Sequence, residues 1–305
     1  MFNALLALDF LGGRIERIDL ADGAVTTIVS DTGPAPDGVG YDAATDRIYW
    51  TTMGRPEKVS APTSLGEDYD FSKPNGSVRS ARLDGSDIRV IVPSDGTMTT
   101  GKQLTLDSAA GYVYFADREG SRVSRVGMDG AGKVDLVVNL PTDDPGNNCV
   151  GVAVDSANGH LYWTQKGRAK SGEGRILGAG LAIPTDRTAE HRTDIETLWR
   201  RLPEPIDLEI DPIAGYLYWT DRGAPPNGNT LNRAPLPKPG DHGLQPEILA
   251  DGFAEAIGLT VDFDARIAYV ADLGGTIRAV ALDGSGSDRV LVHRDKRPFT
   301  GITGV

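Results

Sequence analysis

The chain has 305 residues, of which 39% are apolar, so it is long enough to bury a substantial core. Its 31 Lys and Arg residues are outnumbered by 43 Asp and Glu residues, and a net charge of -12 argues against binding to nucleic acid or to an anionic membrane. No apolar segment approaches the roughly 20 residues that span a bilayer. The single cysteine, Cys149, excludes an internal disulfide framework. Because no basic leader precedes the first apolar run, we expect a cytoplasmic protein.

A short phrase built around an aromatic pair recurs along the chain. In chain order its copies are LLALD near the start, DRIYWTT (46–52), GYVYFAD (111–117), GHLYWTQ (159–165), GYLYWTD (215–221) and ARIAYVAD (265–272). The tyrosines that mark five of these copies recur every 48 to 65 residues. Such a period is typical of propeller blades that carry insertions.

Each copy lies within a frame of four short strands. A strand that ends in aspartate comes before the phrase, a third strand follows it, and a fourth strand comes after a turn that is Asp-Gly in most repeats. We interpret Asp-Gly as a two-residue hairpin turn with positive φ at both central positions. Four strands repeated six times predict an all-β protein, a six-bladed β-propeller of four-stranded antiparallel blades that forms one domain over residues 1–305.

The two ends of the chain complement each other in this frame. The N-terminal phrase has no first strand before it, and TGITGV (300–305) has the pattern of a first strand with nothing after it. We therefore expect the first blade to be completed by the C-terminal strand, which closes the ring and removes exposed sheet edges.

The phrase LYWTD within DPIAGYLYWTDRG is a specific motif, and the chain resembles the YWTD propellers, the class B repeats of lipoprotein receptors, over nearly its whole length. The resemblance implies a six-bladed propeller. A group that recurs around a ring does not form one active site, so we interpret Tyr218, Trp219, Thr220 and Asp221 as scaffold. The aromatic side chains should fill the space between blades, and the Thr and Asp side chains should hydrogen-bond the backbone at strand ends.

Function is then expected where the repeats differ. Gln103 and Asp207 replace the glycine that other first strands carry, and Glu209 replaces a small residue of an inner strand. We expect a polar set near the central axis, comprising Asp37, Lys102, Gln103, Asn147, Asn148, Glu204, Asp207, Glu209, Glu255 and Thr300. In this set we assign Glu209 or Asp207 as a base and Lys102 as an anion-stabilising group.

Oxygen ligands of this kind also suit a divalent cation. Glu209, Asp207 and Asn148 are the candidate ligands for Ca²⁺ or Mg²⁺ on the axis. The arrangement is similar in kind to gluconolactonase and regucalcin propellers, which hold one divalent ion with carboxylates and an asparagine. The alternative is a water-filled channel lined by solvated acids, with Lys102 paired to one of them. The chain has no phosphate-binding glycine loop, so we expect neither a nucleotide nor a flavin.

Three long loops, which follow the phrase in blades 2, 4 and 5, carry positive charge on this acidic protein. We expect them on the face of the channel mouth, where Arg55, Lys166, Arg168 and Arg222 would bind an anionic small molecule together with the polar set. Tyr69 and Phe71, in the loop 53–76, would cover it. The alternative is an ordinary solvated loop surface.

The single cysteine and an insertion in blade 4 also support predictions. Cys149 is expected to be a buried small hydrophobe rather than a nucleophile, and the insertion near 180–194 is expected on the opposite face, where it suits a partner or self-association contact. We predict a small-molecule enzyme acting at the channel mouth, a hydrolase, lyase or isomerase, as a monomer or dimer. The alternative is a non-catalytic propeller that binds a protein or peptide on its loop-rich face.

Overall fold

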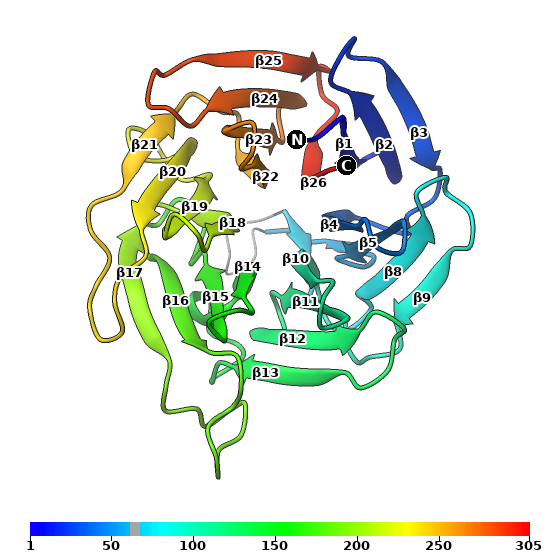
Figure 1. Cartoon of the computed structure of the whole chain (residues 1–305). Coiled ribbons are helices and arrows are strands. Elements are labelled where there is room, and N and C mark those ends of the chain that lie inside the picture. Colours follow the sequence, from blue (N-terminus) through cyan, green and yellow to red (C-terminus); the bar gives the residue numbers. More distant parts are fainter. Residues whose placement is uncertain (62–67) are drawn as a thin grey trace.

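The computed structural model describes residues 1–61 and 68–305 and contains six four-stranded antiparallel sheets arranged around a central axis (Figure 1). The predicted fold class, an all-β six-bladed propeller, is confirmed. We number the blades 1 to 6 in chain order, starting with the sheet that contains both ends of the chain. In the described residues no helix is long and apolar enough to cross a membrane.

The blades share one strand order, from the axis to the rim. The innermost strands, in order of blades 1 to 6, are β26 (Phe299–Gly304), β4 (Pro36–Asp42), β10 (Gly101–Asp107), β14 (Cys149–Asp155), β18 (Pro205–Asp211) and β22 (Ala256–Asp262). The second strands are β1 (Ala4–Asp9), β5 (Arg47–Thr52), β11 (Tyr112–Asp117), β15 (His160–Gln165), β19 (Tyr216–Asp221) and β23 (Ile267–Asp272).

The outer half of each blade follows the same order. The third strands are β2 (Arg14–Asp19), β8 (Ser77–Arg82), β12 (Arg122–Gly127), β16 (Gly174–Gly180), β20 (Thr230–Pro235) and β24 (Thr276–Ala281). The fourth strands are β3 (Val25–Val29), β9 (Arg89–Val92), β13 (Val134–Val138), β17 (Glu196–Leu202), β21 (Glu247–Ala250) and β25 (Asp288–His293). Two short strands, β6 (Glu57–Lys58) and β7 (Tyr69–Asp70), pair within the loop of blade 2, and the 3₁₀ helix η1 (Pro145–Asn147) precedes β14.

Blade 1 is built from the two ends of the chain, as the sequence predicts. Strand β26 pairs with β1 in antiparallel register, with Leu5 opposite Gly304 and Asp9 opposite Phe299. Both termini lie near the axis on the same face of the ring (Figure 1). The ring is thereby closed, so each inner strand has neighbours on both sides.

The repeated phrase supplies the packing between blades. Trp50, Trp163 and Trp219 are at most 1% exposed, and each lies on a second strand. In the core between blades 4 and 5, for example, Trp219 packs against Trp199 with ring centroids 5.4 Å apart, among Leu198, Leu208 and Leu217. The scaffold interpretation of these aromatic residues is confirmed, because they fill the space between neighbouring sheets.

The threonine of the phrase joins one blade to the next. Thr220 Oγ1 accepts a hydrogen bond from Asp207 N at 3.1 Å in its own blade and donates to Ile257 O at 2.7 Å in the following blade. Thr51 and Thr164 make the equivalent pair of bonds. The aspartates of the phrase accept backbone N–H groups at the end of the strand, as Asp221 does from Glu204 and Gly223. The predicted backbone hydrogen bonds are therefore confirmed.

The Asp-Gly turns differ from the predicted hairpin geometry. Gly23, Gly85, Gly130 and Gly284 have positive φ, but the aspartate before each does not. That aspartate instead accepts the backbone N–H two residues further on, for example Asp84 Oδ1 from Ser86 N at 2.9 Å. The two-residue prediction was wrong because an Asx turn satisfies the aspartate without a left-handed backbone.

The insertion between β16 and β17 projects from the rim of the ring beside β13 (Figure 1). It begins on the face opposite the long loops, where Leu181 N donates to Gly159 O in the turn between β14 and β15. It then turns onto the outer edge of blade 3, where Val138 N donates to Ala189 O and the buried Arg192 donates to Leu136 O. The predicted position on the opposite face is therefore right only for the start of the insertion, because the remainder pairs with an open strand edge.

Candidate functional site

Six equivalent positions surround one end of the central channel. They directly follow the last residue of the repeated phrase, and we call them the mouth ring: Phe10, Met53, Arg118, Lys166, Arg222 and Leu273. In five blades the backbone N–H at this position donates to the carbonyl of the residue just before the innermost strand, at 2.8–3.1 Å. This shared bond holds the ring positions in place. The ring is divided, because blades 6, 1 and 2 supply apolar side chains whereas blades 3, 4 and 5 supply cations.

A second set of equivalent positions lies one layer deeper. It comprises the second residue of each innermost strand, and we call it the floor ring: Asp37, Lys102, Val150, Ile206, Ile257 and Thr300. The polar residues of the floor ring come from different blades than the cations of the mouth ring. Blades 1, 2 and 3 supply the polar residues, and blades 4, 5 and 6 supply an apolar cluster of Val150, Ile206 and Ile257 with Leu273 packed against it.

The two rings enclose a cavity of about 450 Å³, which we call the mouth cavity. Its cationic and polar lining comes from Asp37, Lys102, Arg118, Arg222 and Thr300, together with Asp68. Its apolar lining comes from Phe10, Met53, Tyr69, Phe71, Ile257, Leu273 and Pro298. A concave site with mostly apolar walls and a few convergent polar groups is the usual form of a small-molecule site.

Lys102 and Asp37 form a buried ion pair in the floor of the mouth cavity. The Lys102 ammonium donates to Asp37 Oδ2, and Gln103 Nε2 donates to Asp37 Oδ1 at 3.1 Å. Burial lowers the pKa of Lys102, and the neighbouring Asp37 carboxylate opposes this shift. This pairing belongs to the alternative considered for the channel, in which Lys102 pairs with one of its acids, and the acid is Asp37.

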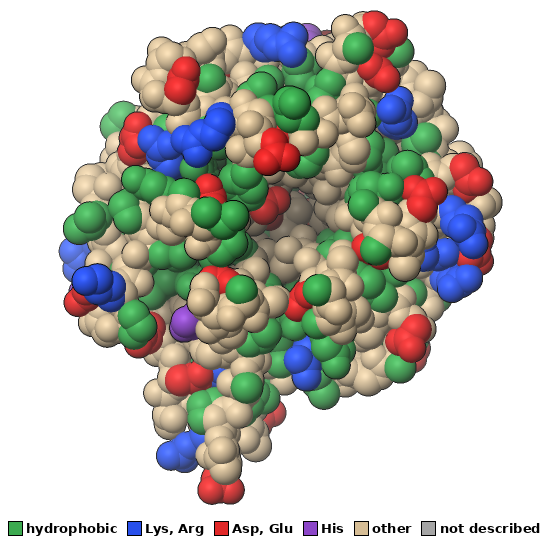
Figure 2. Space-filling view, in the orientation of Figure 1, with side chains coloured by type: hydrophobic (Ala, Val, Ile, Leu, Met, Phe, Trp, Pro, Cys, Tyr) green, Lys and Arg blue, Asp and Glu red, His purple; other side chains and the backbone are tan. Residues whose placement is uncertain are grey.

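Asp207 and Glu209 lie deeper, in a separate cavity of about 170 Å³. This lower cavity is also lined by Gln103, Leu104, Thr105 and Thr303, and the ring is hollowed at its centre on the face that carries the termini (Figure 2). Lys102 does not line it. The structure therefore does not bring the three predicted catalytic residues to one cavity, because Lys102 lies three positions nearer the mouth along its inner strand than Glu209 does along its own.

The two acids of the lower cavity differ in their partners. Asp207 accepts Leu208 N and Leu259 N, both at 2.9 Å, and so ties β18 to β22. Within the described part of the chain, no group donates a hydrogen bond to the Glu209 carboxyl. Burial raises the pKa of each residue to about 8, and Asp207 adds to the shift of Glu209. Glu209 is half-buried, and its exposed part lines the lower cavity.

Glu204 collects the cations of blades 4 and 5. Its fully buried carboxylate accepts Arg222 Nε at 2.7 Å, Lys166 Nζ at 3.4 Å and the backbone N–H of Lys170 at 2.9 Å. Glu255 adds an ion pair with Lys170 at 2.8 Å and lies 3.8 Å from Arg222 Nε. Lys166 is thus held against Glu204 and does not line the mouth cavity, contrary to its predicted role in binding a ligand.

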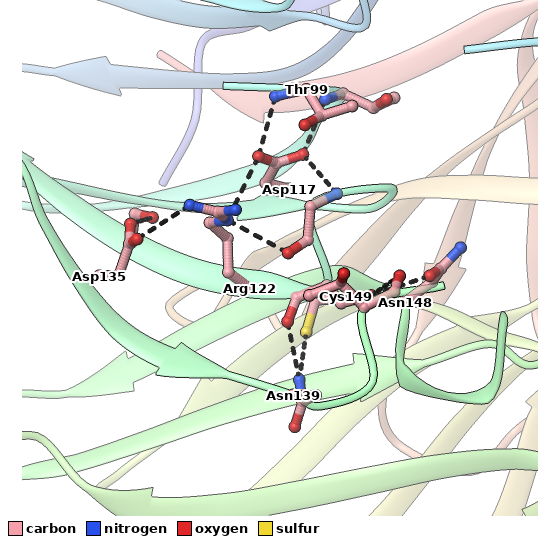
Figure 3. Close-up of polar contacts among 12 residues, drawn as sticks. Thr99, Asp117, Arg122, Asp135, Asn139, Asn148 and Cys149 are labelled. Carbon is pink, nitrogen blue, oxygen red and sulfur yellow. Dashed lines mark hydrogen bonds and ion pairs between the residues drawn. The ribbon is translucent and has the colours of Figure 1, made fainter. Parts of the chain in front are cut away.

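Asn147 and Asn148 lie between blades 3 and 4, away from both cavities. Asn148 Oδ1 accepts the Ser121 hydroxyl at 3.1 Å, and Asn147 Nδ2 donates to Pro141 O at 3.0 Å. Figure 3 shows Asn148 beside the buried Cys149, whose sulfur accepts from Asn139 at 3.2 Å. Burial raises the pKa of the Cys149 thiol far above its usual range, so the prediction of a buried hydrophobe is confirmed.

The predicted metal set does not fit this geometry. Asn148 is used between blades, and both Asp207 oxygens accept backbone N–H groups, which leaves Glu209 without the two partners proposed for it. Among the residues described, no group of three or more His, Cys, Asp or Glu side chains is placed to hold a metal ion. Glu209, Asp207 and Asn148 therefore do not form, among the described residues, the Ca²⁺ or Mg²⁺ site expected from the sequence.

The long loops supply less of the site than the sequence predicts. Arg55 and Arg168 are exposed and lie outside the linings of both cavities, and Arg168 pairs with Glu173 at 3.1 Å. Tyr69 and Phe71 do line the mouth cavity, as expected of residues that cover a ligand. Residues 62–67 of the loop 53–76 lie outside the described residues.

Among the lining residues that the sequence analysis did not predict, Phe10, Met53, Arg118 and Leu273 share one position in the repeat. A signal for them exists in the sequence, because each occupies the position directly after the repeated phrase. Comparing that column across the six repeats would have shown three apolar and three basic residues. Arg118 also lies 5.6 Å over the Phe71 ring and pairs with Glu119 at 2.7 Å, so it is fixed within the wall.

Comparisons with known proteins agree with this fold. No protein-family model matches the chain. It is 38% identical, over 95% of its length, to a Cochliobolus heterostrophus protein named 3-hydroxyacyl-CoA dehydrogenase-like protein LAM1, of which it spans 60%. It is also 38% identical, over 95% of its length, to a Pyricularia oryzae protein named low-density lipoprotein receptor-related protein 1, of which it spans 91%.

Solved structures share the architecture at much lower identity. A nidogen/laminin complex contains a chain that matches with a TM-score of 0.72 at 18% identity, over 98% of this chain and 97% of that one. A gluconolactonase from Xanthomonas campestris matches with a TM-score of 0.62 at 14% identity, over 99% of this chain and 88% of that one. Identities this low show a common fold alone. The sequence relationship is closer, and with 38% identity over nearly all of both chains the protein belongs to the family of the Pyricularia oryzae low-density lipoprotein receptor-related protein 1.

Proposed function

We propose that the mouth cavity is the active site of a small-molecule hydrolase that opens a lactone or a related ester. The observation that carries the proposal is the buried Lys102–Asp37 ion pair in the floor of a cavity large enough for a small organic molecule. A carboxylate and an ammonium held side by side at low exposure are suited to proton transfer and to stabilising negative charge.

The reaction follows from the positions of these two groups. Asp37 takes a proton from water as the water oxygen attacks the carbonyl carbon of the substrate. Negative charge develops on the carbonyl oxygen, where the Lys102 ammonium stabilises it. When the carbon–oxygen bond of the ring breaks, the leaving alkoxide takes the proton from Asp37, and the product is a hydroxy acid, which releases its carboxyl proton to water and becomes a hydroxycarboxylate. Thr300, whose hydroxyl donates to Pro36 O at 2.9 Å, lines the same floor.

Asp37 replaces Glu209 and Asp207 as the base in this proposal. Asp37 lines the same cavity as Lys102, whereas the other two acids line the lower cavity. Several structural neighbours are named as lactonases, among them the Xanthomonas gluconolactonase. They share only the fold with this chain, and they serve here to choose the first substrates for a test.

The test is hydrolysis of a panel of lactones followed by pH-stat titration. The panel should hold sugar lactones and lactones with alkyl or aryl substituents. We expect the wild type to hydrolyse at least one of them, and Asp37→Asn to lower kcat by at least about 100-fold, in the range typical of a lost general base. Arg168→Gln is the matched control, because Arg168 is exposed outside the cavity. Absence of turnover on the whole panel, or equal rates for Asp37→Asn and the wild type, would contradict the proposal and favour a non-catalytic binding face.

A further inference from the structure

Another cavity lies on the side of the ring, between blades 4 and 5. It measures about 600 Å³, within the usual range of small-molecule sites, and we call it the side groove. Its lining includes the end of β17, Trp219 and Asn232 of blade 5, and the segment 242–246. It shares no lining residue with the mouth cavity, so a ligand bound here would be independent of the proposed function.

One wall of the side groove is a segment of blade 5 that crosses onto blade 4. The connection between β20 and β21 runs along the outer side of β17 (Figure 1), where Gly243 N donates to Leu198 O and Trp199 Nε1 donates to Leu244 O, both at 2.8 Å. A Cβ at Gly243 would lie 1.9 Å from Trp199 Cε2, so only glycine permits this close approach. These contacts also occupy the edge of β17 at Leu198. The groove is therefore suited to a compact ligand rather than to an added peptide strand.

Two arginines at the end of β17 bring positive charge to the side groove. Arg200 and Arg201 both line it, although neighbours in a regular strand point to opposite faces. The pairing of β16 with β17 shifts register here, with Arg175 opposite Arg200 and Gly174 opposite Leu202, which leaves Arg201 as the extra residue of a bulge. Among the described residues, neither guanidinium has an ion pair or a hydrogen bond. Their N–H donors are therefore available to an anion.

The lining contains one carboxylate, and its oxygens bond the backbone. Asp221 is 1% exposed, and both of its carboxylate oxygens accept Glu204 N at 3.0 Å, while Oδ1 also accepts Gly223 N at 2.8 Å. Burial raises the pKa of Asp221 to about 7, so it carries only part of its charge at neutral pH. The charges of the lining therefore favour an anion over a cation.

Uncharged polar groups complete the side groove. Asn232 is 5% exposed, and its Nδ2 donates to Thr230 Oγ1 at 2.9 Å and to Trp219 O at 3.5 Å. In the described part of the chain, no group donates to Asn232 Oδ1. A buried amide oxygen of this kind needs a donor from water or from a ligand. Further hydrogen-bonding side chains in the lining are Asn227, His242 and Gln245. Such groups are suited to a ligand that carries hydroxyl groups.

We infer that the side groove binds a small polyhydroxylated anion, such as a phosphorylated or acidic sugar, with its oxyanion against Arg200 and Arg201 and a hydroxyl group donating to Asn232 Oδ1. Phosphate and carboxylate share the chemistry that the two guanidinium groups recognise. The experiment distinguishes these two sources of the charge.

Isothermal titration calorimetry with four probes tests the inference. D-Glucose 6-phosphate and D-glucuronate carry both an oxyanion and the hydroxyl groups of a sugar, D-glucose lacks the charge, and inorganic phosphate lacks the sugar. We expect at least one of the two charged sugars to bind at least about tenfold more tightly than either glucose or phosphate, because each of these lacks one of the two contributions. The tighter of the two identifies the anionic group. If neither charged sugar reaches this difference, the inference is overturned.

Variants locate the site. Arg200→Gln removes one exposed guanidinium and should weaken binding of the tighter charged sugar about tenfold while leaving glucose binding unchanged. Asn232→Ala should weaken binding of both, and the exposed Arg200 tests the inference even if Asn232→Ala fails to fold. Arg289→Gln is the matched control, because Arg289 is also an exposed arginine of an outermost strand but lies outside the side groove, and it should bind as the wild type does. Unchanged affinity for the charged sugar in Arg200→Gln would contradict the inference.

Discussion

Replacing Thr220 by Val should destabilise the ring more than its small change in shape suggests. Thr220 is fully buried, and its hydroxyl accepts Asp207 N at 3.1 Å and donates to Ile257 O at 2.7 Å. Valine has nearly the same shape but leaves a buried donor in blade 5 and a buried acceptor in blade 6 without partners. Each unpaired group costs about 1–3 kcal/mol, so we expect the free energy of unfolding to fall by about 2–6 kcal/mol.

Urea denaturation followed by circular dichroism measures this change. The midpoint should fall while the slope stays constant, since the amount of surface exposed on unfolding is unchanged. Thr220→Ser keeps the hydroxyl and should recover most of the loss. Thr26→Val, on the exposed face of the rim strand β3, is the matched control and should change stability by no more than about 0.5 kcal/mol. A loss below that value in Thr220→Val would refute the role assigned to the threonine of the phrase.

Three further predictions concern buried groups. Asp207 and Glu209 each have a pKa of about 8 in the folded protein, well above the value near 4 of an unfolded chain. The folded state therefore holds more protons, and stability that is fully present below about pH 4 is lost as the pH rises towards 8. Thermal unfolding at a series of pH values should show this loss of stability, and the loss should be smaller in Glu209→Gln. The same pH dependence in the variant and the wild type would contradict the raised pKa of Glu209. Glu204→Gln removes a fully buried carboxylate that pairs with Lys166 and Arg222 and should cost about 3 kcal/mol in urea denaturation, with partial recovery in Glu204→Gln/Lys166→Met. If the double variant were less stable than the single one by a further similar amount, the pairing would be wrong. Cys149 should not react with a thiol reagent such as DTNB in the native state and should react fully in denaturant, because its thiol is buried with a raised pKa; fast native labelling would show that the strand is open there.

The fold follows from the sequence because its signal is repeated. Six copies of one phrase fix the register of each blade, and the pattern at the two ends predicts the pairing of β26 with β1 that the structure shows. One irregular copy of the phrase does not change the predicted fold, because the other copies show the same pattern. The Asp-Gly turns were the exception, since the same dipeptide serves both a left-handed hairpin turn and an Asx turn, and only the backbone distinguishes them.

The candidate site was harder to predict. Knowing which polar residues lie on the inner strands does not tell how far each lies from the mouth of the channel. Lys102 and Glu209 both lie on innermost strands, but three positions of register place them in different cavities. The sequence also does not show which charged side chains form ion pairs. Lys166 and Arg222 look like free cations in the sequence, yet both converge on Glu204 from a different loop. Arg118 and Leu273 were not predicted, because they directly follow the repeated phrase, whereas the predicted cations lie mainly in the long loops.

The most direct test of the account compares kcat/KM for Asp37→Asn and Glu209→Gln on the same lactone. The account predicts a loss of at least about 100-fold for Asp37→Asn and a value within about threefold of the wild type for Glu209→Gln, because only Asp37 lines the mouth cavity with Lys102. The reverse order, with Glu209→Gln inactive and Asp37→Asn active, would contradict it and move the chemistry to the lower cavity.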